Sequence, residues 1–264
     1  MARAQRRGII YAGCGWLAYL GPTPPLSAHA HPALGLYVGL DGPIRVGDAT
    51  RSVPLLCVPP ETVTPPITPD GREMAFLFLS AEHPAFADAR ARTERSSCHE
   101  TPGQLQTLAA LLREIRRERT GGDEAFTRIA EALALEDTPP THSRLERALA
   151  WLRDHPTDEL SLEDVARHVH LSPRRFQTVF REGTGIRFRR YRLWQRLQAA
   201  AEELPQYRHL TDLALTAGFA DLAHLSRSFR DMFGIAPFKG LRAAGPFSFR
   251  PIRNLHPPSA GLTH

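Results

Sequence analysis

The sequence contains little cysteine, with three residues among 264. Cys14, Cys57 and Cys98 stand far apart, without the paired spacing of a zinc cluster or the density of a disulfide framework. We therefore expect no bound metal and no disulfides, and this usage fits a reducing compartment. Long hydrophobic runs are also missing, since no segment approaches the roughly 18 apolar residues of a membrane span. A membrane is therefore not an expected partner.

Lysine is almost absent as well. Among the 33 lysines and arginines, only Lys239 is a lysine, and the formal net charge is +5. A positive excess favours an anionic partner. Arginine is the side chain suited to bidentate recognition of phosphate and of guanine. The same bias can arise from the base composition of a genome, so composition alone leaves both interpretations open.

The N-terminal residues resemble an export signal, because Arg3, Arg6 and Arg7 precede the apolar stretch GIIYAGCGWLAYLG. That stretch is interrupted by glycines and stops at Gly-Pro-Thr-Pro-Pro. Such punctuation is equally typical of short β-strands with a turn. We adopt the strand interpretation and expect a cytoplasmic protein.

Residues 9–100 are expected to form the first domain. Apolar runs at 34–40, 53–60 and 74–80 are separated by Gly- and Pro-rich segments, a pattern that predicts a small antiparallel β domain. Residues 81–101 read as a loop or a transition.

Residues 101–137 change to a helical period. Leu105, Leu108, Leu112 and Ile115 form one apolar stripe, a second follows in 126–133, and the two predict a helical hairpin. The stripes would either mediate a homodimer or pack against the β domain.

Residues 141–242 predict an all-α domain. Ser161 with Asp164 is a capping-box pattern, and Ser172-Pro173 marks a second helix start. Residues 243–264 lack a sustained period and are expected to form a flexible tail. The fold class is therefore α+β.

One segment of this all-α domain occurs twice. Before a turn the offset between the copies is 48, as for Ala166 and Ala214, and after it the offset is 49, as for Phe180 and Phe229. The second copy thus has one extra residue near Gly218. Each copy is a short helix, a tight turn and a second helix, the layout of a helix-turn-helix.

The second helix of each copy is amphipathic, with apolar residues such as Phe176 and Leu225 on one side. Side chains on the opposite sides are of the kinds that contact base edges and phosphates. A merely solvated polar face is the alternative for either helix alone, but two copies with matching turn and cap signals favour DNA. The candidate contacts are Arg174, Arg175, Gln177, Thr178 and Arg181 in the first copy and Ala223, His224, Ser226, Arg227 and Arg230 in the second.

Two stretches carry a family resemblance: SLEDVARHVHLSPRRFQTVFREGTGIRFRRYR and LTDLALTAGFADLAHLSRSFRDMFGIAPFKGLR. Residues 144–242 resemble the DNA-binding domain of AraC/XylS-type transcriptional regulators. The resemblance implies two helix-turn-helix units, joined by a rigid helix at about 188–203, that read neighbouring major grooves of duplex DNA. It implies base contacts for Arg174, Gln177, Thr178, Ser226 and Arg227. Arg181 and Arg230 lie one turn further along their helices, and we expect them to contact phosphates. An activator with RNA polymerase as a further partner would fit, although no residue decides between activation and repression.

Two positions depart from the family pattern. Pro205 stands where the linker helix usually continues, so that helix is expected to end early. Gly240 occupies a position that is commonly aromatic, which weakens the expected last packing contact.

Residues 29–43 resemble the start of the cupin-like sensor of some of these regulators. His29 and His31 reproduce the His-x-His of cupin metal sites, but Gly35 and Leu36 occupy the place of the Glu ligand, and Glu61 or His83 would have to complete the set. We therefore expect a metal-free pocket for a small organic effector, with His29 or His31 near its opening.

Two enzyme classes compete with a regulator. One is a metal-dependent cupin enzyme fused to a DNA-binding domain. The other is a DNA-repair methyl acceptor, whose four-cysteine zinc site three scattered cysteines cannot supply.

Overall fold

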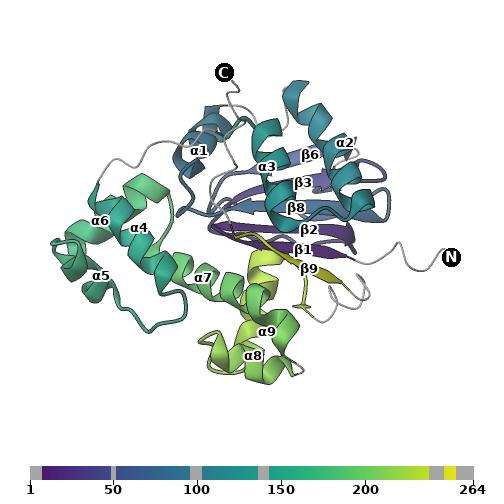
Figure 1. Ribbon diagram of the computed structural model, residues 1–264. Helices are drawn as coiled ribbons and strands as arrows, with labels where there is room; N and C mark the ends of the chain where they lie inside the picture. Colours follow the sequence, from purple (N-terminus) through teal and green to yellow (C-terminus); the bar gives the residue numbers. More distant parts are fainter. Residues whose placement is uncertain are drawn as a thin grey trace, which may run out of the picture.

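The computed structural model describes residues 8–48, 52–95, 103–135, 143–207, 209–237 and 247–253. Lys239, Gly240 and Cys98, which the sequence singles out, lie outside these ranges. The described chain combines two β-sheets with helices on both sides, which confirms the α+β class (Figure 1).

The larger sheet has six strands in the order β6-β3-β8-β2-β1-β9, and the smaller has three in the order β5-β4-β7. The N-terminal apolar stretch forms the hairpin β1–β2, as the strand interpretation predicted. The strands are β1 (Ile9–Gly13), β2 (Trp16–Pro22), β3 (Leu34–Gly39), β4 (Ile44–Val46), β5 (Ser52–Val53), β6 (Leu55–Val58), β7 (Ile67–Pro69), β8 (Glu73–Leu79) and β9 (Ser248–Pro251).

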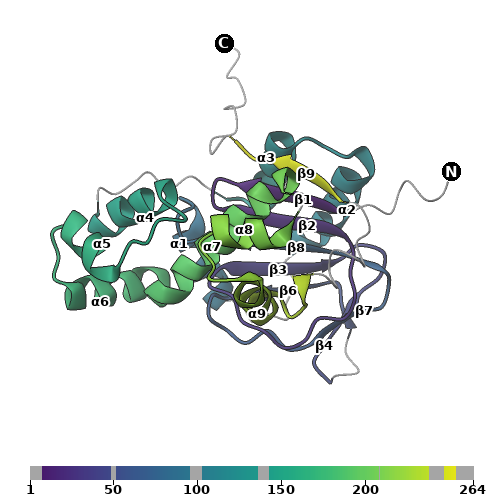
Figure 2. The ribbon, with the colours of Figure 1, turned by 90° about the horizontal axis from the view of Figure 1, so that it is seen from below.

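Helices cover both faces of the larger sheet: α2 (Gly103–Glu118) and α3 (Gly122–Ala132) lie over one face, and the helices of residues 188–233 lie over the other (Figure 2). Successive side chains of β8 point to opposite faces of the sheet, so this strand contributes to the hydrophobic core on each side. Leu77 and Leu79 belong to the core shared with the α2–α3 hairpin, and Phe78 to the core shared with the C-terminal helices. The central strand is therefore buried on both sides.

The predicted hairpin is confirmed, and its apolar stripe faces this chain's own sheet. Leu108, Leu112 and Ile115 are fully buried. Arg116 on α2 donates to the carboxylate of Glu73 on β8, with Nε at 2.7 Å from Oε2. Of the two arrangements that the sequence left open, packing against the β domain is the one that the fold contains.

The C-terminal domain consists of α4 (Arg144–Asp154) followed by two helix pairs around a long helix. The first unit is α5 (Leu162–His168) with α6 (Pro173–Thr184), and the second is α8 (Leu210–Thr216) with α9 (Leu222–Phe233). Between them runs α7 (Phe188–Glu203), with the bounds predicted for the linker. A short 3-10 turn, η2 (Leu204–Gln206), follows at Pro205, so the helix ends early as expected.

Two segments differ from the sequence expectation. Residues 81–101 were expected to be a loop or a transition, but they contain α1 (Phe86–Arg95), whose Phe86 and Ala89 are buried. The tail expected to be flexible contains β9, which pairs in parallel with β1. Both elements depend on contacts with distant parts of the chain, which local periodicity does not report.

Candidate DNA interface and an apolar cavity

Helix α6 presents its polar face to solvent. All five candidate residues of the first copy are exposed: Arg174, Arg175, Gln177, Thr178 and Arg181. On the opposite side, Phe176 and Phe180 are fully buried. The ring centroid of Phe180 lies 5.5 Å from that of Phe188 and 5.3 Å from that of Tyr191, both on α7. This aromatic core fixes the orientation of the polar face.

Helix α9 repeats the arrangement. Ala223, Arg227 and Arg230 are exposed, and His224 and Ser226 are half-buried. Leu225 and Phe233 are buried on the other side. All ten candidate residues therefore lie on helices whose free faces can meet a groove, and none of them lies in the core.

The same local signals begin and end both recognition helices. Ser172 Oγ accepts a hydrogen bond from the backbone N–H of Arg175 at 3.3 Å, and Asp221 Oδ1 accepts one from that of His224 at 2.5 Å. Each cap satisfies a free donor of the first turn. The helices end at Gly185 and Gly234, whose φ angles of 76° and 68° are left-handed. The repeat read from the sequence is therefore a structural repeat.

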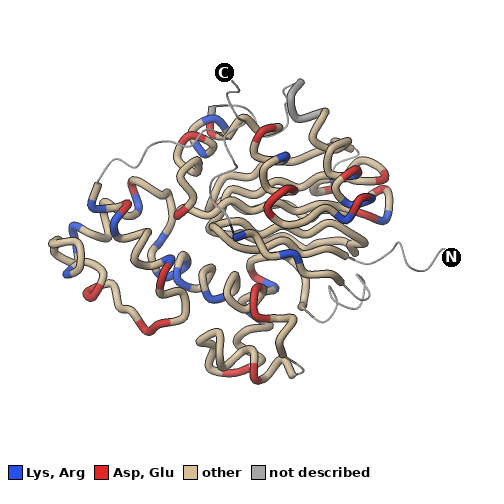
Figure 3. Tube along the Cα trace, viewed as in Figure 1, with Lys and Arg blue, Asp and Glu red and all other residues tan. Residues whose placement is uncertain are grey.

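Basic residues are more numerous around the first unit. Figure 3 shows Lys and Arg positions along α4 to α7 and fewer around α8 and α9. Arg187 and Arg189, which directly follow the first unit, are exposed. The described residues of the second unit include the basic residues Arg227 and Arg230 and the acidic residues Asp212, Asp221 and Asp231, so this unit has no excess of positive charge.

Helix α7 is attached to the β domain along its length. Arg190 donates through Nε to Glu61 Oε1 at 2.7 Å, and Tyr191 donates its hydroxyl proton to Glu82 Oε2 at 3.0 Å. One turn further, Trp194 Nε1 donates to Ser80 Oγ at 2.7 Å. The helix that joins the two units thus also joins them to the sheet.

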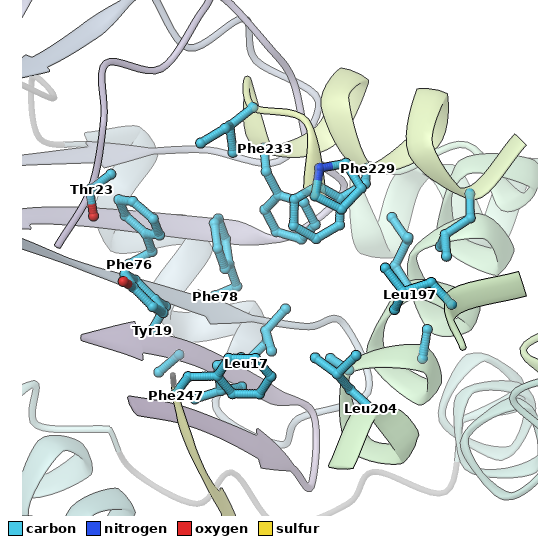
Figure 4. Close-up of a pocket in the computed structure, with 18 of the residues that line it drawn as sticks. Leu17, Tyr19, Thr23, Phe76, Phe78, Leu197, Leu204, Phe229, Phe233 and Phe247 are labelled. Atoms are coloured by element: carbon cyan, nitrogen blue, oxygen red, sulfur yellow. The ribbon is translucent and has the colours of Figure 1, made fainter. Parts of the chain in front are cut away.

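An apolar cavity of about 160 Å³ lies between the larger sheet and the second unit (Figure 4). Tyr19, Phe76 and Phe78 line it from the sheet, Leu197 and Leu204 from α7 and η2, and Phe229 and Phe233 from α9. Among the described residues that line it, none carries a charge. The cavity can therefore take hydrocarbon but offers no ionic partner to a ligand.

Sequence reasoning missed this cavity. Its walls come from β1, β2 and β8 at one end of the chain and from residues 197–237 and Phe247 at the other. The available signal was the second apolar face of β8, where Phe76 and Phe78 alternate with residues of the opposite core.

The two predicted effector residues do not line this cavity. Between β2 and β3, His29 Nδ1 donates to Ser27 O at 2.7 Å, which leaves Nε2 to accept from the Tyr37 hydroxyl at 2.6 Å. His31 Nδ1 donates to Ala33 O at 2.9 Å. Burial, together with the charge of His29, lowers the pKa of His31 to about 3. Burial also lowers the pKa of His29, so both rings are neutral at pH 7.

The residues proposed for a cupin-type metal set have other partners. Glu61 pairs with Arg190, and the His83 ring stacks edge-on against Trp16 and Phe126. In the part of the chain that the structure describes, no group of three or more His, Cys, Asp and Glu side chains could hold a metal ion. None of the described helices has the length and apolar character needed to span a lipid bilayer.

The free polar faces of α6 and α9 define the class: residues 165–242 match the family described as a helix-turn-helix domain. The chain is 31% identical over 121 residues to the regulatory protein PocR of Salmonella typhimurium and 37% identical over 106 residues to the transcriptional activator RhaS of Escherichia coli. These matches cover 46% and 39% of this chain but only 38% and 37% of the relatives. The C-terminal part is therefore a DNA-binding domain of the AraC type, as the resemblance implied.

Solved structures extend the likeness to the whole fold. ToxT from Vibrio cholerae O395 superposes with a TM-score of 0.54 over 87% of this chain and 98% of ToxT, at 9% identity. An apo form of a ToxT variant from strain SCE256 gives 0.55 over 89% and 100%, at 10% identity. At such identity the likeness concerns the fold alone: an N-terminal β domain followed by two helix-turn-helix units.

Proposed function

We propose that this protein is a sequence-specific transcription regulator that places α6 and α9 in two neighbouring major grooves of duplex DNA. The observation that carries the proposal is the pair of recognition helices with the same caps, buried apolar sides and exposed polar faces. Consecutive grooves on one face of DNA are about 34 Å apart. Helix α7, with 16 residues, spans about 24 Å of that separation.

Within this proposal, Arg227 is the guanine-reading residue of α9, because an exposed guanidinium can donate to O6 and N7 of guanine together. Ser226 assists it, and Arg174, Gln177 and Thr178 read bases from α6. Arg181 and Arg230, one turn further along their helices, contact phosphates and thereby fix the register.

We also propose an effector that enters the apolar cavity. One ToxT structure is described as bound to an unsaturated fatty acid, and another to a naphthalene-substituted butenoic acid. A cavity of about 160 Å³ resembles in size one that holds benzene, so a longer chain has to separate the sheet from the second unit. Because the described lining residues carry no charge, we assign hydrocarbon to the buried part of the ligand and place any carboxylate at the cavity mouth.

The proposal includes no catalytic role, because the matched relatives are regulators and the described His and Glu residues form no metal set. As a regulator of chromosomal DNA, the protein would work in the cytoplasm and act with RNA polymerase. We propose that it activates transcription, as the name of the relative RhaS states for that protein. One chain contains both reading units, so binding to two grooves does not require the homodimer that was one expectation for the apolar stripes of the α2–α3 hairpin.

Titration of the full chain with labelled duplex DNA from the region flanking its own gene tests this function. Binding through arginine and phosphate releases counterions, so the affinity is expected to fall by orders of magnitude between about 50 and 200 mM salt. An unrelated duplex of equal length serves as the control. Equal affinity for both duplexes, or no salt dependence, would contradict a sequence-specific DNA-binding role.

A further inference from the structure

The C-terminal segment 247–253 returns to the β domain after the second unit. Strand β9 pairs in parallel with β1, with Ile9 opposite Ser248 and Ala12 opposite Pro251. The N–H of Ser248 donates to Gly8 O and that of Ile252 to Ala12 O, each at 2.8 Å. The chain therefore closes its larger sheet with a strand from its other end.

Two glycines of the β domain and the α2–α3 hairpin allow the backbone of this strand to approach closely. A Cβ at Gly13 would overlap the carbonyl oxygen of Ile252, and one at Gly122 would overlap that of Pro251. Arg119 donates to Ser248 Oγ at 2.5 Å, and Asp123 Oδ1 accepts from the N–H of Arg253 at 2.7 Å. Side chains and glycines of the α2–α3 hairpin thus hold both ends of the segment.

The segment also reaches the hydrophobic core and the cavity. The Ile252 side chain is only 6% exposed and packs with the α2–α3 core. Phe247, directly before β9, is one of the residues that line the apolar cavity. Removal of the segment would therefore open the cavity wall as well as the sheet edge.

The second unit is held from its other side as well. The N–H of Ser27 donates to Gly234 O at 2.8 Å, and that of Ala30 to Asp231 O at 3.2 Å. The ring centroid of Phe233 lies 5.4 Å from that of Phe78 on β8. The C-terminal end of α9 is thus docked on the loop between β2 and β3.

We propose that residues 247–253 are a strap that holds the second helix-turn-helix unit against the β domain and closes the apolar cavity. Along the chain, α8 and α9 lie between α7 and the strap, and both of these segments are bound to the β domain. Helix α9 gains freedom to adjust to its groove when the strap leaves β1. The mechanical part of this inference stands on the contacts alone, and its consequence for DNA rests on the proposed function.

Two adjacent glycines offer a matched pair of variants. In Gly122→Ala the new methyl group meets only strap backbone among its nearest atoms, whereas at Gly121 no heavy atom lies within 4 Å of a Cβ. Gly121→Ala is therefore the control. A chain that ends after Pro246 removes the strap altogether.

Amide hydrogen exchange, measured by NMR on the full-length variants without DNA, tests the strap. In Gly122→Ala and in the shortened chain, the amides of Ser27 and Ala30 are expected to exchange roughly tenfold faster, because α9 undocks more often. The amide of Thr64, which donates to His29 O in the same loop, is expected to stay unchanged, as are all three in Gly121→Ala. The fluorescence of anilinonaphthalene sulfonate, an anionic dye whose emission rises at exposed apolar surface, should increase as the cavity opens.

Unchanged exchange at Ser27 and Ala30 in the shortened chain would overturn the strap, because α9 would then be held without it. If the Ile252 amide, which donates to Ala12 O, exchanged at an unchanged rate in Gly122→Ala, the close contact between Gly122 and the strap would not be needed to hold the strap on β1. A DNA titration of the same proteins separates the two proposals. Tighter binding by the shortened chain supports the strap's role in DNA reading, and weaker or equal binding overturns that role. Absence of any DNA binding contradicts the proposed function and leaves the exchange result standing.

Discussion

The two helix-turn-helix units have the same local structure and different surroundings. Helices α6 and α9 share cap type, length and a left-handed glycine end. Behind α6, however, Phe180 packs on Phe188 and Tyr191 of the same domain, whereas behind α9 Phe233 packs on Phe78 of the sheet. The core of the first motif thus lies within the DNA-binding domain, whereas the core of the second, which also includes Trp194 of α7, extends into the β domain.

This difference teaches that a repeated sequence does not imply a repeated role. The exposed face of each helix is set by its own residues, but the freedom of the helix is set by what its buried face touches. The buried face of the first unit packs on α7, and the second unit is coupled to the cavity that its own apolar residues line. The predictions on the helix cores and on the helix caps separate the two units.

The largest effect is expected from Phe180→Ala. Loss of a fully buried aromatic side chain costs about 3–5 kcal/mol of unfolding free energy, enough to loosen the first unit. In hydrogen exchange, α5 and α6 should lose protection while Ser27 and Ala30 keep theirs. Phe233→Ala should do the reverse, because that ring packs on the sheet. Loss of protection in both units from either variant would show that their cores are not separate.

The next largest effect concerns base reading. Arg227→Ala should cost about 1–3 kcal/mol on the cognate duplex and relax the preference at one base pair. Arg230→Ala should weaken binding to all duplexes alike, because a phosphate contact carries no sequence information. Titration of both variants on the cognate site and on single-base variants measures this. A uniform loss with Arg227→Ala would move that residue to the phosphate contacts.

Capping gives a smaller and matched comparison. Ser172→Ala and Asp221→Ala each remove one side-chain acceptor from a first helical turn, at about 1 kcal/mol of helix stability. In the first unit this should appear as faster exchange of the Arg175 amide, and in the second of the His224 amide. The docked end of α9 should leave Ser27 protected in Asp221→Ala. Faster exchange of the Ser27 amide in that variant would mean that the first turn of α9 and its docked C-terminal end unfold together.

A separate effect, on the pH dependence of stability, is expected from the contact between α7 and the β domain. Burial raises the pKa of Glu82 to about 7, while the Tyr191 hydroxyl and the charge of Arg153 lower it and Glu202 raises it further. A carboxyl with a raised folded-state pKa stabilises the fold fully below its unfolded pKa, and this contribution is lost as pH rises to about 7. Glu82→Gln should flatten the decline in melting temperature between pH 4.5 and 7. An unchanged pH profile would exclude Glu82 as its source.

Much of the C-terminal domain could be predicted from the sequence, because its signals are local. The caps at Ser161 and Ser172 are fixed by residues within one helical turn, and the structure confirms them. The bounds of α7, which the family resemblance implied, also agree with the structure. The candidate DNA residues could be placed on exposed faces for the same reason.

The remaining features depend on contacts between distant segments. The four residues of β9 carry no strand period, and they are extended because the edge of β1 and the α2–α3 hairpin hold them. His29 and His31 were expected to open onto a ligand pocket, but the spacing could not show that their ring nitrogens bond to Ser27, Tyr37 and Ala33. Their role toward an effector stays a prediction.

Hydroxyl-radical footprinting of the full chain on its own operator tests the central claim, that each unit reads its own groove. The account predicts two protected stretches about one helical turn apart on one face of the DNA. Arg174→Ala should weaken one stretch and Arg227→Ala the other. A single protected stretch, or equal loss of both stretches from either variant, would contradict it.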